Sequence, residues 1–295
     1  MFSADLGGST VVVVSGFALF GGGYTSLNVA VTDKYFYGDN TRVAGTSLGT
    51  ARSSFAAAGN AVVGIFGGGV SSVLVSVTDK YTYSGDIVSA GTNLGTVRGS
   101  HTAVGVTSVG IFGGGSAPTT SATTDKYTYS GDTRVAGTSL GTARTELAAA
   151  GNATVGIFGA GFTTVTTDVT DKYTYSGDTR VAGTSLGTAR TALAATGNAT
   201  VGFFGGGITT VNTSSTRRYT YNGDTVAAGS ALGSARRFLA AAGNSTVGIF
   251  GGGFVSGPVA TTDRITFDTN TRAAGTALGT ARYTLAASSS SPGGF

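Results

Sequence analysis

Residues 124–145 read TDKYTYSGDTRVAGTSLGTART, and residues 170–191 repeat this stretch letter for letter, 46 residues later. The same spacing separates six glycine clusters, each preceded by phenylalanine, which begin at Gly21, Gly67, Gly113, Gly159, Gly205 and Gly251. An arginine recurs with this period at Arg52, Arg98, Arg144, Arg190, Arg236 and Arg282. A fixed period of this length is typical of propellers and other repeat architectures, so six equal units are predicted.

The repeat runs through the chain without a linker, which predicts one domain over residues 1–295. Its units cover approximately residues 7–52, 53–98, 99–144, 145–190, 191–236 and 237–282, and residues 283–295 supply a closing strand and a tail. Strands are predicted in the fourth unit and the start of the fifth at residues 153–158, 169–175, 181–186 and 192–196. Glycine and β-branched residues interrupt every stretch of helical length, so helices are not expected.

Four short strands per unit predict an all-β fold, a six-bladed β-propeller of four-stranded antiparallel blades with a 46-residue repeat. The recurring phenylalanines and tyrosines are expected to fill the space between blade faces. Glycine also stands inside the apolar second strand, at Gly64, Gly110, Gly156, Gly202 and Gly248. Because glycine weakens a strand unless something approaches it closely, these positions predict a close approach of neighbouring backbone.

The combination of three features resembles kelch repeats: Phe-Gly-Gly ending the second strand, a Tyr-x-Tyr third strand, and an arginine before the next first strand. This resemblance extends over nearly the whole chain and implies a kelch-type propeller. The sequence departs from the family pattern in one respect, since Val-Ala-Gly-Thr stands where a tryptophan is usual near the fourth strand. The Gly-, Thr- and Ala-rich repeats are also similar to kelch-type repeats in bacterial and bacteriophage reading frames.

Two segments of the sequence could supply the strand that closes the ring. Residues 283–289 (YTLAASS) match the start of a unit, and residues 7–13 (GGSTVVV) have the same phase at the other end. The C-terminal copy is predicted to close the ring because it keeps Arg282 and Leu285, whereas Leu6 replaces the arginine before the N-terminal copy. The surplus N-terminal strand would then be free to pair with another chain.

Composition excludes several classes of protein. The chain has no cysteine, which excludes disulfide scaffolds and thiol enzymes, and its glycine clusters lack the Lys-Ser/Thr of a phosphate-binding loop. No cofactor and no metal site are predicted. No apolar run approaches the ~18 residues of a membrane helix, and the N-terminus lacks the basic region of a signal peptide. No signal peptide, transmembrane segment or membrane insertion is therefore expected.

The recurring arginines allow two interpretations. They could surround a channel mouth and hold an anion, or each could bond carbonyls or an aspartate of the neighbouring blade; the invariance of the position favours the structural role. A second series alternates with tyrosine and is expected to point inward and pair with arginine. It comprises Asp33, Asp79, Asp125, Asp171 and Asp263, with Arg217 in the fifth unit.

No catalytic residue is assigned, and the chain is not expected to be an enzyme. His101 occupies a position that holds Phe55 or leucine in the other units, so it is predicted to be a core residue rather than a ligand. Glu146 is the only glutamate, in a turn-like context. An enzyme at the axis of the ring stays open as a third hypothesis, because one asymmetric cluster of carboxylates would suffice for it.

The basic residues do not form a nucleic-acid-binding tract. Six lie beside the aspartate series, six form the arginine series and four lie in turns, which places 16 of the 18 lysines and arginines at repeating positions. A basic nucleic-acid surface would cluster them on one face or along one element. The distribution argues against nucleic acid as the main partner.

The segments after the glycine clusters differ most among the units. Their phase places them between the second and third strands, on one face of the disc, where binding residues commonly lie. Low charge and many Thr, Ser and Val residues suit a protein neighbour, with carbohydrate as the alternative. The candidate binding residues are Tyr24, Leu27, Val73, Thr119, Phe162, Val165, Ile208, Asn212, Phe254 and Val255.

The leading functional hypothesis is a non-enzymatic structural or binding propeller that makes protein–protein contacts. The resemblance to bacterial and bacteriophage repeats implies a component of a bacteriophage particle or bacterial surface assembly, located in a virion or at an extracellular surface. The alternative is a stand-alone module that binds carbohydrate or protein.

Overall fold

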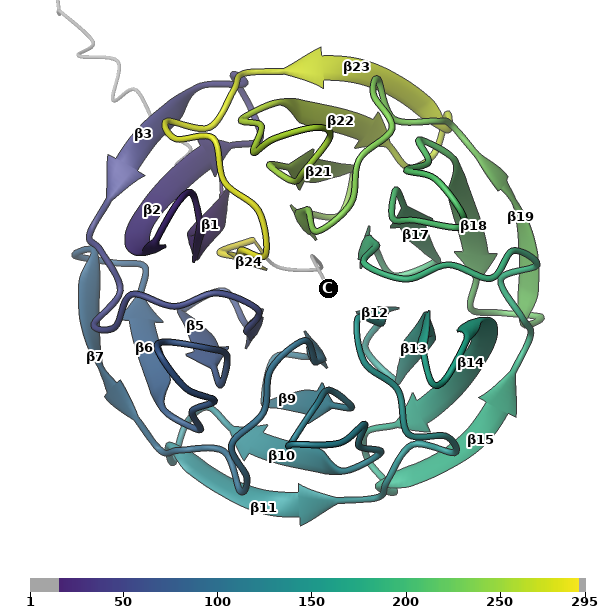
Figure 1. Cartoon of the computed structure of the whole chain (residues 1–295), viewed down its shortest axis with the longest axis horizontal. Coiled ribbons are helices and arrows are strands. Elements are labelled where there is room, and N and C mark those ends of the chain that lie inside the picture. Colours follow the sequence, from purple (N-terminus) through teal and green to yellow (C-terminus); the bar gives the residue numbers. More distant parts are fainter. Residues whose placement is uncertain (1–15, 292–295) are drawn as a thin grey trace, which may run out of the picture.

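The computed structural model describes residues 16–291, which form six four-stranded antiparallel sheets and, within that range, no helix. The sheets are arranged around a common axis like the blades of a propeller (Figure 1). This confirms the predicted fold: all-β, six blades, four strands in each, with a spacing of about 46 residues.

Each blade has one strand at the axis, two in the middle and one at the rim. The axial strands are β4 (Ala56–Gly59), β8 (Thr102–Gly105), β12 (Ala148–Gly151), β16 (Ala194–Gly197), β20 (Ala240–Gly243) and β24 (Ala286–Ser289). The second strands are β1 (Phe17–Tyr24), β5 (Val63–Gly67), β9 (Val109–Gly113), β13 (Val155–Phe162), β17 (Val201–Gly205) and β21 (Val247–Gly251). The third strands are β2 (Asn28–Phe36), β6 (Thr78–Thr82), β10 (Thr124–Thr128), β14 (Thr166–Thr174), β18 (Thr216–Thr220) and β22 (Thr262–Thr266). The rim strands are β3 (Arg42–Gly45), β7 (Ile87–Gly91), β11 (Thr133–Gly137), β15 (Thr179–Gly183), β19 (Thr225–Gly229) and β23 (Thr271–Gly275).

The C-terminal strand β24 closes the ring. It pairs antiparallel with β1, with Ala18 opposite Ser289 and Gly21 opposite Ala286, so blade 1 has the order β24-β1-β2-β3. The Tyr37 hydroxyl, at the end of the third strand of that blade, makes a 2.9 Å hydrogen bond with Ser289 Oγ. The prediction for the C-terminal copy is thus confirmed; the N-terminal copy, residues 7–13, lies outside the described residues.

One predicted strand is misplaced. The rim strand of the fourth blade was expected at residues 181–186, but β15 covers Thr179–Gly183. The chain then leaves the sheet, because the fully buried Leu186 packs into the core between blades 4 and 5. Its N–H donates to the carbonyl of Asp168 instead of to a strand. The apolar Leu186 is therefore part of the blade-to-blade core rather than of the rim.

Each blade seats its phenylalanine against a glycine of the preceding blade. The Phe66 ring, which is fully buried, lies so close to Gly21 that a Cβ there would be 3.1 Å from Phe66 Cε1. The same relation holds around the ring and ends with Phe20 against Gly251. Burial of such a ring stabilises the fold by roughly 1.5–3 kcal/mol. A side chain at the first glycine of any cluster would therefore crowd the buried core between blades.

The glycines inside the second strands have a different explanation from the expected one. A Cβ on Gly110 would lie 2.7 Å from the Tyr129 hydroxyl and 2.9 Å from Ala58 Cβ of the preceding blade. These are side-chain contacts, so the predicted close approach of backbone is wrong for this position. Glycine is needed there because the tyrosine hydroxyl and the alanine of the neighbouring axial strand fill the space that a side chain would take.

Candidate functional site

One face of the disc carries two kinds of connection: the segment before each axial strand, and the segment between the second and third strands. Both differ in sequence among the blades. On this face, isolated antiparallel bridges join the segment before each axial strand to the connection between the second and third strands, as between Ser53 and Val70 or Thr145 and Phe162. We call this surface the loop face. It comprises residues 24–28 and 53–54 and their equivalents in the other blades, and it contains the predicted binding residues.

The tips of the loop face expose apolar side chains at one repeated position. Leu27 is 72% exposed and Val165 is 65% exposed, and Val73 lies at the same position. Thr119 occupies it in the third blade and is also exposed. Each projects from its own hairpin tip, and none belongs to a buried hydrophobic cluster. Their exposure leaves them accessible to a partner, and their role in binding stays a prediction.

A second set of predicted residues lies on the bridges themselves. Tyr24, Phe162, Ile208 and Phe254 are each paired through backbone to the segment before an axial strand. Asn212 has a structural role, because its amide donates to the Val255 carbonyl at 3.2 Å and its Oδ1 accepts from Arg237 at 3.2 Å. Asn212 therefore ties blade 5 to blade 6 rather than standing free for a ligand, and Val255 beside it stays exposed.

Aromatic rings converge where blade 6 meets blade 1. The Tyr283 ring lies 5.1 Å from Phe254, 5.6 Å from Tyr24 and 6.1 Å from Phe238, measured between centroids. The Arg237 guanidinium sits over the Phe254 and Phe238 rings at 5.1 and 5.6 Å. All five side chains are half-buried. We call this group the aromatic–arginine cluster; cation–π and edge-to-face contacts hold it in a fixed geometry.

Sequence reasoning missed three members of this cluster. Arg237 and Tyr283 occupy a position that holds Ser53, Gly99 or threonine in the other blades, and Phe238 follows Arg237. A column-by-column comparison of the units would have found them as large side chains at otherwise small positions. The predicted residues Tyr24 and Phe254 belong to the cluster, whereas the structure does not bring Leu27, Val73 and Val165 into it.

A closed ring of backbone hydrogen bonds encircles the axis on the loop face. Each of six equivalent residues donates its N–H to the carbonyl of the equivalent residue in the preceding blade, at 2.7–2.9 Å. They are Ser54, Ser100, Glu146, Ala192, Phe238 and Thr284. All six are left-handed, with φ between 52° and 57°, although none is glycine. This conformation costs energy, and the ring of hydrogen bonds offsets it.

Three small cavities follow one another along the axis beneath this ring, with volumes of about 70, 110 and 50 Å³. The walls of the second and third cavities are mainly alanines of the axial strands, and the second also includes the leucines that precede four of these strands. The titratable side chains among their lining residues are His101 and Glu146. The Glu146 carboxylate accepts a 2.8 Å hydrogen bond from Thr191 Oγ1. The described part of the axis therefore offers no pair of carboxylates to a substrate.

His101 is a core residue, as predicted. Its side chain is buried against the Phe112 ring, 6.2 Å away between centroids. Neither ring nitrogen reaches a well-aligned hydrogen-bond partner. Burial, and after it the positive charge of Arg98, lower the pKa of His101 well below its ordinary value. The imidazole is thus neutral at neutral pH.

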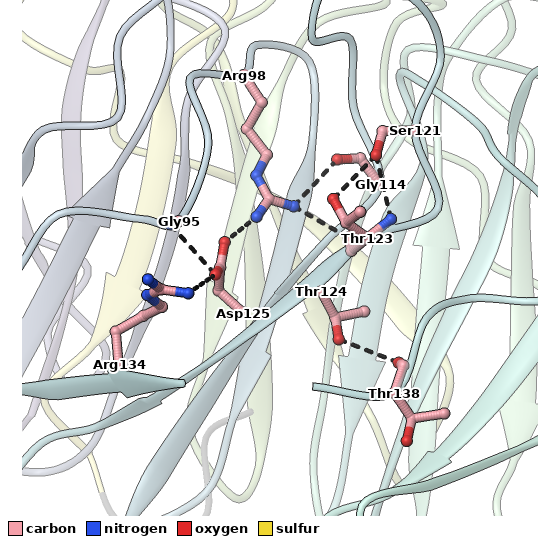
Figure 2. Close-up of polar contacts among 9 residues, drawn as sticks. All are labelled: Gly95, Arg98, Gly114, Ser121, Thr123, Thr124, Asp125, Arg134 and Thr138. Atoms are coloured by element: carbon pink, nitrogen blue, oxygen red, sulfur yellow. Dashed lines mark hydrogen bonds and ion pairs between the residues drawn. The ribbon is translucent and has the colours of Figure 1, made fainter. Parts of the chain in front are cut away.

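The arginine series does not surround the channel mouth but lies buried between blades. In the third blade (Figure 2), Arg98 contacts Asp125 and donates to the Thr123 carbonyl at 3.0 Å. Asp125 also accepts from Arg134 Nη1 and from the Gly95 N–H, both at 3.2 Å. Ion pairs of the same kind join Arg52–Asp79, Arg144–Asp171, Arg236–Asp263 and Arg282–Asp33. The structural interpretation is confirmed for these five positions.

The fifth blade departs from this pattern, because Arg217 replaces the aspartate. Arg190 is fully buried like its equivalents and donates to the Ser215 carbonyl at 2.8 Å. No ion pair joins it to any carboxylate of residues 16–291. The blade thus contains two guanidinium groups where its siblings have an arginine and a carboxylate.

Residues 16–291 contain no group of three His, Asp or Glu side chains placed to hold a metal ion. In the same range no helix is long and apolar enough to cross a membrane. Neither the models of known protein families nor the curated proteins gave a match to the chain. The propeller fold therefore stands on the structure itself, and kinship with kelch repeats stays a prediction from the sequence motifs.

Proposed function

We propose that the chain is a non-enzymatic binding propeller that docks a protein neighbour on its loop face within a larger assembly. The observation that carries this proposal is the aromatic–arginine cluster, half-buried beside tips that expose Leu27 and Val73. Tyrosine, phenylalanine and arginine are enriched at the centres of protein interfaces, and lysine, glutamate and aspartate are depleted there.

The scaffold supports this assignment because the repeat buries its own charges. Five of the six arginines of the buried series are paired to aspartates between blades, so apart from Arg237 and Glu146 the loop face carries hydroxyl, amide and apolar groups. A surface of this kind binds by shape and apolar burial rather than by charge. The resemblance of the repeats to those of bacterial and bacteriophage proteins makes a virion or bacterial surface assembly the setting that we propose.

The experiment compares two double variants of the full chain. Phe254→Ser with Tyr283→Ser alters the aromatic–arginine cluster, and Val135→Ser with Val181→Ser alters two exposed rim side chains as the control. We expect the first pair to lower incorporation into the native assembly at least tenfold and the rim pair to leave it unchanged. Equal incorporation of both variants, with both folded by circular dichroism, would contradict the proposal.

The alternative is a stand-alone module that binds carbohydrate. The same half-exposed Tyr24, Phe254 and Tyr283 rings, with threonine and serine hydroxyls nearby, would suit the apolar faces of sugar rings. Sedimentation velocity distinguishes the two candidates. A monomer at all concentrations that binds glycans through the cluster favours the alternative, and association that the cluster variant abolishes favours docking of protein.

A further inference from the structure

A carboxylate between blades has the same environment in five of the six blades. It accepts from a backbone N–H of the preceding connection and from a buried arginine, as Asp125 does from Gly95 and Arg98. In the first, third, fourth and sixth blades it also meets an arginine of the rim strand, such as Arg134. This combination of donors forms a cradle for one carboxylate.

The fifth blade keeps the buried arginine of the cradle but lacks its carboxylate. Arg190 donates through Nη1 to the carbonyls of Gly206 and Ser215, as Arg98 does to those of Gly114 and Thr123. The difference lies at Nη2, which contacts Asp125 in Arg98 but has no hydrogen-bond partner in Arg190; Nε is unpartnered in both arginines. A fully buried guanidinium with two free donors is energetically costly.

Arg217 adds a second cation to the fifth cradle. Its side chain is only partly buried, and Nη2 donates to Thr188 Oγ1 at 2.6 Å. Burial, and then the positive charge of Arg217, lower the pKa of Arg190 to about 10, so Arg190 stays charged at neutral pH. Val226 stands where the rim arginine lies in four other blades, so Arg217 takes over the role of second cation.

The glycine of this connection has different surroundings in the fifth blade. A Cβ on Gly95 would lie 2.8 Å from Asp125 Oδ1, whereas a Cβ on the equivalent Gly187 would meet no atom within 4 Å. Gly187 has φ +73°, and its N–H donates to Ser185 Oγ at 3.1 Å. The carboxylate of Asp168, in β14, accepts a 2.5 Å hydrogen bond from the Ser185 hydroxyl of this connection.

The equivalent position in the sixth blade can be reached from outside. A groove of about 240 Å³ there is lined by Gly233, Asp263 and Arg272, among other residues. In the fifth blade the residue at the position of Asp263 is Arg217, whose side chain is partly exposed, whereas Arg190 is fully buried.

We propose that the fifth blade binds a small oxyanion between Arg190 and Arg217, in the place that an aspartate carboxylate occupies in the other five blades. The ligand is a group with at least two acceptor oxygens and a net negative charge, either a carboxylate or a phosphate. Planar guanidinium groups match both through paired N–H donors. The site is separate from the loop face and does not depend on what docks there.

The test measures the thermal unfolding temperature of the full chain in sodium acetate, sodium phosphate and sodium chloride at pH 7 and equal ionic strength. We expect acetate, phosphate or both to raise the unfolding temperature by roughly 2 °C or more over chloride, because ligand binding to the native state stabilises it. A response to acetate alone identifies a carboxylate ligand, and a response to phosphate alone identifies a phosphate ligand. Equal unfolding temperatures in all three salts would overturn the proposal.

Two variants test whether the rise in unfolding temperature comes from anion binding at Arg190. Arg217→Asp supplies the missing carboxylate within the chain and is expected to abolish the response to acetate and phosphate. Arg218→Asp makes the same change in charge at the next residue, on the opposite side of β18, and should keep the response. An unchanged response in Arg217→Asp, or its loss in Arg218→Asp, would contradict a site at Arg190. Isothermal titration of the unaltered chain with acetate and phosphate gives a readout that needs no variant, and absence of saturable heat with both would also overturn the proposal.

Discussion

Arg98 and Arg190 are the same residue in the same backbone setting, yet their electrostatic environments are opposite. Both are buried between blades and both donate to two equivalent carbonyls. Arg98 then meets Asp125, as Figure 2 shows, whereas Arg190 faces Arg217. The carbonyl bonds therefore suffice to place the arginine, and the aspartate serves to neutralise it. A propeller tolerates the loss of one such pair because five other blade interfaces keep theirs.

The comparison predicts a large difference between two identical substitutions. Arg98→Met leaves Asp125 buried with only Arg134 and Gly95 as donors, and we expect it to lower the free energy of unfolding by about 3–5 kcal/mol. Arg190→Met leaves no carboxylate behind and removes an unpaired buried charge, so we expect a change within about 1 kcal/mol. Urea denaturation of both variants measures the difference. Equal losses would show that the carbonyl bonds, rather than the ion pair, account for the stability of the interface.

Restoring the pair in the fifth blade should have an intermediate effect. In buffer without acetate or phosphate, Arg217→Asp is expected to raise the free energy of unfolding by about 1–3 kcal/mol, because it gives Arg190 the partner that Arg98 has. The measurement is the denaturant midpoint at constant slope. A lower midpoint would mean that the fifth cradle has adapted its shape to arginine.

His101 marks a second position at which one blade carries a different residue from the other five. Its pKa lies well below the ordinary value of about 6.5 in the folded state, so the folded protein binds fewer protons than the unfolded chain as the pH falls below that value. The stability that the neutral imidazole contributes is present above pH 6.5 and is lost as the pH decreases toward the folded-state pKa.

His101→Leu restores the residue found in most equivalent positions. We expect about 1 kcal/mol of stabilisation at pH 7, since two unpartnered buried nitrogens are removed, and a larger gain at pH 5. Unfolding curves at the two pH values measure this. A gain that does not grow between pH 7 and pH 5 would contradict a depressed pKa.

The smallest effect is expected on the loop face. Leu27→Ser together with Val165→Ser should change the free energy of unfolding by no more than about 0.5 kcal/mol, because both side chains are largely exposed. Thermal unfolding of the double variant and of the unaltered chain measures the difference. A loss above 1 kcal/mol would place these side chains in the fold rather than in a binding surface.

The fold could be predicted from the sequence because the 46-residue period leaves few architectures open. Closure by residues 283–289 could also be predicted, since only that copy retained Arg282 and Leu285. The backbone ring could not, because serine, alanine, phenylalanine and threonine give no local signal for a left-handed conformation. The end of β15 was missed because the role of Leu186 depends on the next blade.

In the sequence, the candidate sites can be recognised only where a residue departs from the repeat. Sixteen of the 18 basic residues lie at repeating positions, and the remaining two are Arg217 and Arg237. The structure places one in the fifth cradle and the other in the aromatic–arginine cluster. The sequence could not predict that Tyr24 and Tyr283 lie side by side, because they meet only when the last strand returns to the first blade.

Hydrogen–deuterium exchange of the full chain, alone and within its native assembly, tests the proposed role of the loop face most directly. We expect slower exchange in the assembly at residues 24–28, 237–238, 254–255 and 283–284, with the rim strands β7 and β11 unchanged. Slower exchange confined to the rim strands, with the loop face exchanging as it does in the isolated chain, would contradict it.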